Sequence, residues 1–297
     1  MRIVLSIFAL PHEIDELENT LTQLRKASYY LNKTNEWVLD VTMCLADDMV
    51  DWKQSSLPKQ FFIDKMLKLS NNVDWCAKYF KISESVKGCV SQRKASLVQH
   101  DNADYFIWLD TDIIFDERTL IYFESVLPTI SEKTDYSIIT PEIVRIWDTT
   151  WDSLVNQNFL DKPLSYHKTN DPYKDCGVKG EIELESVSLG IPNQPRFKFA
   201  GGWFTCLSGE LLRRIGIPES FSHYGYEDTF VMWGAEKLMK TTDINIQQYK
   251  IKNLVVCENY RYRNNSHYIS NMSILDRREE FKKIAEENFN EELGNLT

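Results

Sequence analysis

The stretch DYFIWLDTDIIF, residues 104–115, sets two aspartates into an otherwise apolar segment. Tyr105 to Leu109 is an uninterrupted run of aromatic and branched side chains, which is typical of a buried strand in a parallel sheet. Asp110-Thr111-Asp112 follows at once. Two unpaired carboxylates in a protein interior would each cost several kcal/mol. The pattern therefore predicts a strand whose carboxyl end opens into a cleft, where ligands of open α/β sheets bind.

Asp110 and Asp112 are separated by one residue, so their carboxylates are able to share one hard divalent cation. A diphosphate would add further oxygen ligands to such an ion. A D-x-D triplet also arises by chance in an acidic chain, where it forms a solvated turn that caps a helix. The interpretation as a cation site therefore needs support from the rest of the sequence.

The composition favours a globular protein. With 297 residues, the chain is long enough for one sizeable α/β domain with an insertion or for two small domains. The net charge of -10 disfavours binding to nucleic acid and to anionic membranes. The six cysteines lie far apart and form no C-x-x-C pair, which argues against a zinc knuckle and a disulfide framework. We expect them to be reduced core thiols.

The apolar segment at residues 3–10 is the only one near the N-terminus. It is short and runs into Pro11-His12-Glu13 without a small-residue cleavage site, so it predicts a first strand instead of a signal peptide. No stretch approaches the roughly 18 to 20 apolar residues of a membrane span. We therefore expect a cytoplasmic protein without a membrane span.

Strands and helices alternate in the hydrophobic pattern. Strands are predicted at residues 2–8, 37–46, 80–82, 105–109, 137–140 and 251–257. Helices are predicted from Ile14 to about Leu31, and at residues 84–100, 119–127, 210–215, 227–240 and 273–293. Pro128 is expected to end the helix at residues 119–127. Gly216 and Pro218 are expected to end the helix at residues 210–215, whose N-cap is Ser208. This order predicts a mainly parallel sheet with helical crossovers.

Residues 142–197 interrupt the alternation, being rich in Asp, Asn, Pro and Lys with scattered aromatic residues. We interpret them as an irregular insertion in a single domain spanning residues 1–297. The insertion would separate an N-terminal half, residues 1–141, from a C-terminal half, residues 198–297, which ends in the terminal helix.

A second passage, residues 199–230, resembles the acceptor-side signature of metal-dependent nucleotide-sugar glycosyltransferases with the GT-A fold. The resemblance is to the galactosyltransferase and family 2 types. Its elements keep their order over some thirty residues: Gly201-Gly202 before Trp203, then Ile215-Gly216-Ile217-Pro218, then Tyr224-Gly225-Tyr226-Glu227-Asp228. It implies a GT-A fold, Rossmann-like with a mainly parallel sheet, and transfer of a sugar from a nucleoside diphosphate to an acceptor hydroxyl.

The resemblance also implies roles for individual residues. Asp110 and Asp112 would bind Mn²⁺ or Mg²⁺, with His267 as the third ligand and His223 as its competitor. Asp228 would be the general base of an inverting reaction. Without the resemblance, Glu227 and Asp228 would simply complement a helix dipole and His267 would be an exposed loop residue.

The sugar donor would be a nucleotide sugar, with a UDP-sugar favoured. Residues 1–141 would form the half that binds this donor, and residues 198–297 the acceptor-side half. Positions that match donor contacts are Ala9, Pro11, Asp47, Arg93, Asp110, Thr111, Gly201 and Gly202. Asp47 or Asp48 would accept a hydrogen bond from uracil or ribose, and Arg93 offers a fork for phosphate. Gly201-Gly202 would let the backbone approach the sugar.

On the acceptor side, Glu227 would bind sugar hydroxyls, while Trp203 and Tyr226 would stack on a sugar face or pack in the core. The acceptor class stays open among glycans, lipid-linked glycans, proteins and modified nucleic acids. Three other functions are considered: a retaining transferase, a sugar-phosphate nucleotidyltransferase and an inactive carbohydrate-binding module. A sugar-phosphate nucleotidyltransferase would carry a Gly-rich loop after the first strand. This chain has Phe8-Ala9-Leu10-Pro11 there, which argues against that function.

Overall fold

The computed structural model describes residues 1–32, 34–45, 57–84, 89–144, 172–187, 197–221, 225–259 and 272–297, of which Val144, Pro172 and 272–282 are described by backbone alone. The strands are β1 (Arg2–Ala9), β2 (Glu36–Cys44), β3 (Ala77–Ser83), β4 (Tyr105–Leu109), β5 (Ile113–Ile114), β6 (Tyr136–Val144), β7 (Gly177–Ser186), β8 (Phe204–Ser208) and β9 (Ile246–Glu258). The α-helices are α1 (Ile14–Ser28), α2 (Lys59–Asn71), α3 (Cys89–Gln99), α4 (Thr119–Ser131), α6 (Pro172–Asp175), α7 (Gly209–Ile215), α8 (Glu227–Thr241) and α10 (Met272–Asn295). Two short 3-10 helices are η1 (Pro11–Glu13) and η4 (Glu219–Phe221).

One mixed sheet runs through the domain in the order β3-β2-β1-β4-β8-β6-β9-β5, with β7 also paired to β9. The first four strands of this order are parallel neighbours. β8 is antiparallel to both β4 and β6, and β6 pairs with β9 in parallel. The predicted single α/β domain with a mainly parallel sheet is confirmed. Because β1, β2 and β4 are parallel, their carboxyl ends meet at the sheet edge where Asp110 lies.

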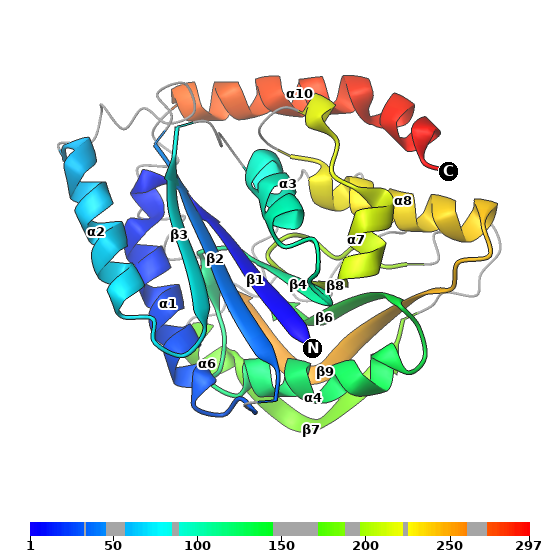
Figure 1. The fold of residues 1–297 in the computed structure, drawn as a ribbon, viewed down its shortest axis with the longest axis horizontal. Coiled ribbons are helices and arrows are strands. Elements are labelled where there is room, and N and C mark those ends of the chain that lie inside the picture. Colours follow the sequence, from blue (N-terminus) through cyan, green and yellow to red (C-terminus); the bar gives the residue numbers. More distant parts are fainter. Residues whose placement is uncertain are drawn as a thin grey trace.

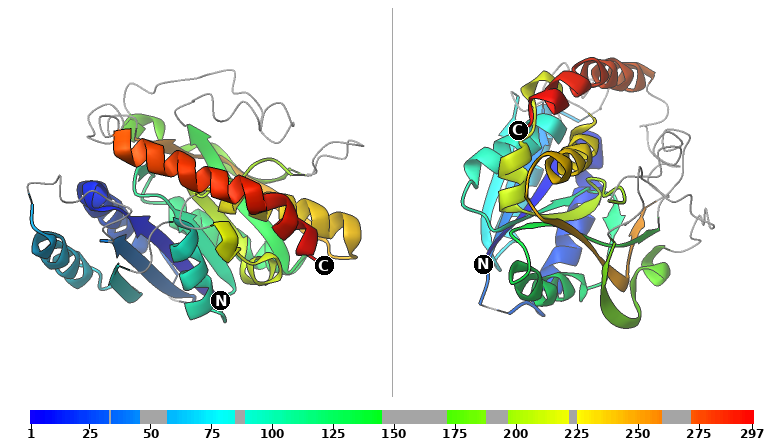
Figure 2. Two further views of the ribbon diagram at one scale, coloured as in Figure 1. Left: turned by 90° about the horizontal axis from the view of Figure 1, so that it is seen from above. Right: turned by 90° about the vertical axis from the view of Figure 1, so that its right-hand side faces the viewer.

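Helices cover both faces of the sheet (Figure 1). One core joins α1, α2 and α4 to the side chains on one face of β1, such as Leu5 and Ile7. The other core joins α3, α7, α8 and α10 to the opposite face, including Val4 and Trp108. Figure 2 shows α10 on the outside of the second layer, where it also contacts η4. The central strands β1 and β4 are buried on both sides, which explains their continuous apolar runs.

Local signals placed several helix ends correctly. Ser208 occupies the N-cap position of α7, although its hydroxyl accepts a hydrogen bond from the Ser137 N–H at 2.9 Å instead of capping the helix. Gly216 ends the helix with φ of 74°, in the left-handed region that glycine adopts without a Cβ penalty.

The prediction that Pro128 stops its helix is wrong. α4 continues for one turn to Ser131, because Ile130 in that turn is fully buried in the core. α2 was not predicted, and β3 and β9 are longer than the pattern predicted, because their extent is set by pairing with strands distant in sequence.

Part of the segment predicted to be irregular is regular. Within residues 142–197, β7 is a strand that pairs antiparallel with β9, with a register shift between Val178 and Glu183. Its side chains are mostly exposed, so it lacks the apolar alternation that marks a buried strand. Residues 145–171 and 188–196 of the predicted insertion lie outside the described residues.

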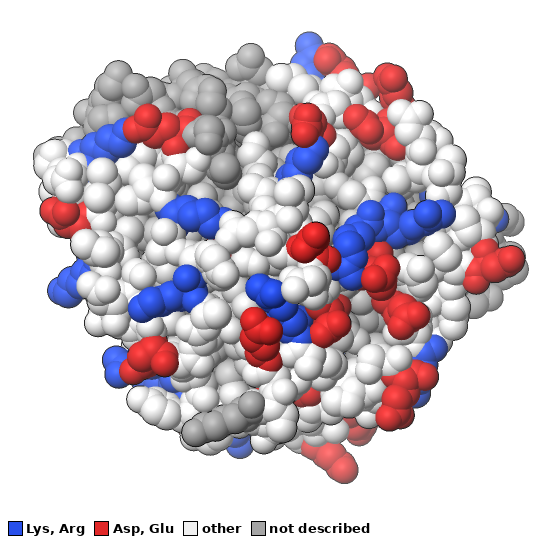
Figure 3. All heavy atoms as spheres, viewed as in Figure 1, with Lys and Arg blue, Asp and Glu red and all other residues white. Residues whose placement is uncertain are grey.

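Three broader expectations concern cysteines, membrane spans and charge. All six cysteines are free thiols, and Cys44, Cys206 and Cys257 are buried. None of the helices described is both long and apolar enough to cross a bilayer. On the face seen in Figure 3, acidic and basic side chains are interspersed. Neither sign forms a continuous area over the described residues of that face.

Candidate functional site

The loop after β4 is held in place by its backbone. The Asp110 N–H donates to the carbonyl of Trp203 at 3.0 Å, which continues the β4–β8 pairing by one residue. The Thr20 hydroxyl donates to the Thr111 carbonyl at 2.8 Å, and the Asn259 N–H to the Asp112 carbonyl at 2.7 Å. The main chain of this loop is thus fixed from α1, β8 and the end of β9. The Asp110 side chain is 46% exposed, whereas Thr111 is buried.

Arg93, on α3, joins this loop to the second predicted motif. Its guanidinium forms an ion pair with Glu227, 134 residues away in sequence, and lies 3.4 Å from Asp110 Oδ1. It also donates to the Gly202 carbonyl at 3.1 Å and lies 4.5 Å above the Trp108 ring. Burial opposes its charge, but Glu227 and Asp110 outweigh burial and raise the pKa of Arg93. The guanidinium therefore stays charged and cross-links the two motifs.

Gly201 and Gly202 make room for side chains of this protein. A Cβ on Gly202 would lie 1.9 Å from Arg93 Nη2, and one on Gly201 would lie 1.9 Å from the Trp203 ring. The expected reason for the pair was approach of the backbone to a sugar. The structure adds a second reason, since the guanidinium and the indole occupy the space that the missing side chains leave, and the approach to a sugar stays a prediction.

Glu227 is a buried carboxylate, only 5% exposed, at the start of α8. Burial raises the pKa of Glu227 to about 7; Arg93 opposes this rise, and Asp228 and Asp110 add to it. Its protonation therefore changes near neutral pH, where a carboxyl group in water would be ionised.

The raised pKa predicts a pH-dependent difference between wild type and Glu227→Gln. Because the folded protein keeps a proton that the unfolded chain releases between about pH 4.5 and 7, folding stability falls as pH rises through that window. The free energy of unfolding of wild type should therefore fall relative to that of Glu227→Gln between pH 5 and pH 8. Urea unfolding in metal-free buffer at both pH values measures it. Glu210→Gln, at an exposed ion pair with Arg213, is the control, and parallel behaviour of both variants would contradict the prediction.

Asp228 is fixed by hydrogen bonds to both carboxylate oxygens. The Gly202 N–H donates to Oδ2 at 3.2 Å, and the Thr229 N–H donates to Oδ1 at 2.6 Å. The first bond ties α8 to the glycine pair of the preceding motif. Asp228 thus shares the cluster of Arg93, Asp110, Gly202 and Glu227, and the catalytic, donor and acceptor roles of these residues stay predictions.

The two aromatic residues predicted to face an acceptor have partners within the protein. The Trp203 ring lies over Gly201 and meets Phe199 edge-on, with centroids 5.5 Å apart. The Tyr226 hydroxyl donates to Glu286 of α10, and its ring packs against Phe289. Both rings serve packing, which was the alternative considered for them.

The remaining predicted positions divide into two groups. Ala9 and Pro11 lie buried at the carboxyl end of β1, at the same sheet edge as Asp110. Asp47, Asp48, His223 and His267 lie outside the described residues.

The donor set suits a hard cation. Asp110 and Asp112 offer carboxylate oxygens at the end of one strand, which are ligands that Mg²⁺ and Mn²⁺ prefer. The partly exposed Asp110 lies at the open side of the loop, and its neighbour Arg93 stands on the buried side. Among the described residues, no three His, Cys, Asp or Glu side chains are grouped to hold a metal by themselves. The two aspartates therefore fit such an ion as partial ligands.

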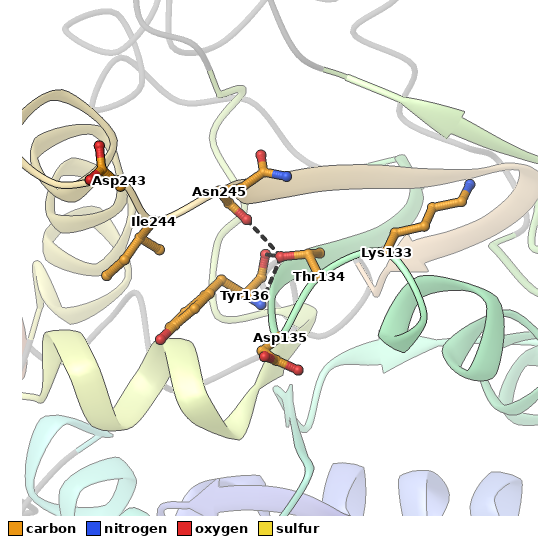
Figure 4. A pocket seen from close by; sticks show the side chains of 7 residues that line it. All are labelled: Lys133, Thr134, Asp135, Tyr136, Asp243, Ile244 and Asn245. Carbon is orange, nitrogen blue, oxygen red and sulfur yellow. Dashed lines mark hydrogen bonds between the residues drawn. The ribbon is translucent and has the colours of Figure 1, made fainter.

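A surface hollow at the opposite sheet edge is separate from this cluster (Figure 4). It is lined by Lys133, Thr134, Asp135, Tyr136, Asp243, Ile244 and Asn245. These residues precede β6 and β9, whereas Asp110 follows β4, which runs parallel to β6. Within the hollow, the Thr134 hydroxyl donates to the Asn245 carbonyl at 2.6 Å. This hydrogen bond joins the loop before β6 to the loop before β9.

Sequence reasoning missed several residues that build the cluster. Trp108 lies within β4 on the same face as Phe106, and Arg93 of α3 lies over its ring. Thr20, Thr205 and Asn259 hold backbone groups of the two motifs, which no local pattern marks. Glu286 is one of many acids in the terminal helix, so nothing in its spacing sets it apart.

The Arg93 packing predicts the effect of a methyl group at position 202. Gly202→Ala should displace the guanidinium from Glu227 and destabilise the fold by about 1–3 kcal/mol, as overpacking does. In an Arg93→Ala background the same change should cost less than half as much, because the clash is gone. Urea unfolding of the four proteins measures this. Gly294→Ala, where a Cβ meets nothing within 4 Å, is the control. Equal costs in both backgrounds would refute the clash.

Comparisons with known proteins yield similar structures only. No family model matches the sequence, and no curated protein is significantly similar to it. The structure of S. aureus TarS in complex with UDP is 14% identical, with a TM-score of 0.47 over 85% of this chain and 60% of that one. The mannosyltransferase PcManGT from Pyrobaculum calidifontis, in complex with GDP-Man and Mn²⁺, is 12% identical, with a TM-score of 0.49 over 87% and 56%. M. tuberculosis glucosyl-3-phosphoglycerate synthase is 14% identical, with a TM-score of 0.46 over 86% and 70%.

Proposed function

We propose that the protein is a metal-dependent glycosyltransferase of the GT-A type. It moves a sugar from a nucleoside-diphosphate sugar, with UDP favoured, to an acceptor hydroxyl with inversion at the anomeric carbon. The observation that carries the proposal is the Arg93 cross-link. It brings Asp110 of the first motif together with Gly202 and Glu227 of the second, and Gly202 in turn holds Asp228.

Asp110 and Asp112 would hold the divalent cation, with His267 as a further ligand. When bound, Mn²⁺ or Mg²⁺ neutralises the charge that develops on a departing diphosphate. The arrangement of this loop supports the assignment, because its backbone is tied on three sides while Asp110 keeps a half-exposed carboxylate. A fixed main chain with an accessible carboxylate is what repeated binding of a metal–nucleotide complex requires.

The donor would lie along the edge formed by β1, β2 and β4, against Ala9, Pro11, Asp47 and Thr111. In this scheme residues 1–141 supply most of the donor contacts. Arg93 would act on the diphosphate from beneath. Glu227 and Asp110 keep its guanidinium charged, so Arg93 would offer charged N–H donors where negative charge accumulates in the reaction.

Asp228 would take the proton of the acceptor hydroxyl as the new glycosidic bond forms. Its carboxylate is aimed by the Gly202 and Thr229 amides, so the base needs no reorientation at the moment of reaction. Glu227, beside it, would bind an acceptor hydroxyl or serve only as the partner of Arg93. Trp203 would form the floor of this side, with its ring against Gly201.

A donor screen tests the function. Release of nucleoside diphosphate is measured from UDP-glucose, UDP-galactose, UDP-N-acetylglucosamine and GDP-mannose, with and without Mn²⁺. We expect slow Mn²⁺-dependent hydrolysis of at least one UDP-sugar, and a β-linked product from its α-linked donor once an acceptor is supplied. Failure to release nucleotide from any donor in a wider panel, or release that ignores metal, would overturn the proposal. A retained anomer would overturn the inverting course alone.

A further inference from the structure

Tyr226, the residue before Glu227 and Asp228, has an unusual backbone conformation. Its φ of 66° and ψ of -3° place it in the left-handed region, directly after Gly225 with φ of 91°. A bulky residue adopts this region at a cost of about 1–2 kcal/mol and keeps it only where the surroundings hold it. The Tyr226 carbonyl nevertheless accepts the first helical bond of α8, from the Phe230 N–H at 2.7 Å. The conformation of Tyr226 thus sets the direction in which α8 begins.

The Tyr226 side chain is held by α10. Its hydroxyl donates to the Glu286 carboxylate, and its ring meets Phe289 at 6.1 Å and 70° between planes. This hydrogen bond is exposed and contributes about 0.5–1.5 kcal/mol, and the edge-on ring contact adds about 0.5–1.5 kcal/mol, so their sum is comparable to the backbone cost. These contacts are therefore large enough to hold the left-handed residue.

α10 also contacts the chain that ends at Phe221 of η4. Phe289 stacks on Phe221 of η4, with centroids 5.8 Å apart and planes 11° apart, and meets Phe230 of α8 edge-on at 5.7 Å. The Asn288 amide donates to the Ser220 carbonyl at 3.3 Å, and the Ser220 hydroxyl donates to Glu292. α10 therefore binds the segments before and after residues 222–225.

We propose that Glu286 and Phe289 are positioning residues for Asp228. By fixing Tyr226 in the left-handed conformation, they orient the first turn of α8 and hold the Asp228 carboxylate against the Gly202 N–H. This inference rests on the proposed function in treating Asp228 as the base. It assigns the terminal helix, which is remote from the metal-binding loop in sequence, a part in the geometry of the site.

The test compares neighbouring acids of α10. Glu286→Ala should lower kcat of sugar transfer by about 3- to 10-fold, which is the rate equivalent of about 1 kcal/mol. The KM for the nucleotide sugar should stay unchanged, because the contact that the described residues give Glu286 is with Tyr226, on the proposed acceptor side. Glu286→Gln keeps an oxygen that accepts from the Tyr226 hydroxyl and should restore most of the rate. Glu287→Ala, which removes an exposed ion pair with Lys283 at 4.0 Å, should match wild type.

Two further measurements make the outcome decisive. In a Tyr226→Phe background, Glu286→Ala should have no further effect, since the hydrogen bond is already absent. Exchange of the Phe230 amide hydrogen should be faster in Glu286→Ala than in Glu287→Ala, and this readout needs no activity. If the donor screen fails while exchange accelerates, the proposed function falls and the positioning stands. Equal exchange in the two variants, or rate losses that add fully to those of Tyr226→Phe, would refute the positioning.

Discussion

Asp228→Asn should lower kcat for sugar transfer by about 10²- to 10⁴-fold, the usual contribution of a general base. The substitution keeps the size of the side chain but removes its ability to take a proton from the acceptor hydroxyl. Donor affinity should stay close to that of wild type, because the nucleotide would be held by the metal-binding loop and the edge of β1 and β2. Steady-state kinetics with varied donor, together with nucleotide binding by calorimetry, separate these two quantities.

The hydrogen bonds of Asp228 add a second expectation. Both oxygens accept a backbone N–H, from Gly202 and from Thr229. An amide offers only one accepting oxygen, so Asp228→Asn leaves one of these donors facing an NH₂ group and should cost about 1 kcal/mol of stability. Glu210→Gln, another acid in the first turn of a helix, is the kinetic control and should stay within about twofold of wild type. A near-normal kcat for Asp228→Asn would reduce Asp228 to a residue that only joins α8 to the glycine pair.

Asp112→Ala should reduce activity by about 10³-fold or more, because loss of the cation forfeits several kcal/mol of charge stabilisation. The Asp112 carbonyl, which accepts the Asn259 N–H, is unaffected by the change, so the loop should keep its course. Addition of EDTA to wild type should have the same effect, and Mn²⁺ should reverse it. Mn²⁺ affinity, followed by the electron paramagnetic resonance signal of the free ion, should fall in parallel.

The control is Asp116→Asn, in the same acidic region. Asp116 accepts the Arg118 N–H at 2.8 Å, a turn that asparagine also forms, so activity and Mn²⁺ affinity should persist. Full turnover of wild type in excess EDTA, or an active Asp112→Ala enzyme, would remove the metal from the proposal. His267→Ala tests the third predicted ligand, whose unchanged Mn²⁺ affinity would exclude it.

The sequence predicted the parts of the fold that local chemistry controls. β4 was evident because it is buried on both faces, and α7 because Ser208 and Gly216 mark its ends. The predicted end of α4 at Pro128 was wrong because the missing N–H of proline is a local signal. The burial of Ile130, which extends α4, is a tertiary effect. β7 escaped notice because its exposed side chains leave no alternation to detect.

The site was predicted as two motifs, and the link between them was not. Asp110, Gly202, Glu227 and Asp228 were assigned to one site, but the pairing of Arg93 with Glu227 and Asp110 was not predicted, and its donor contact stays a prediction. That pairing depends on the placement of Arg93 of α3 beside the first residue of α8, which no local pattern encodes. The left-handed backbone conformation of Tyr226 was not predictable from the sequence either, because aromatic residues rarely adopt it.

The position of β8 in the sheet has a consequence for how the domain folds during synthesis. β8 lies between β4 and β6, although residues 204–208 follow both strands in the chain. A ribosome that has made only residues 1–141 has completed β1 to β5 and begun β6, but one edge of β4 still lacks β8, and an open apolar edge invites aggregation. We expect residues 1–141 to be insoluble as a fragment and folding to wait until β8 inserts. Residues 1–141 and 198–297 therefore form one folding unit, because β8 of the second segment completes the sheet between β4 and β6 of the first.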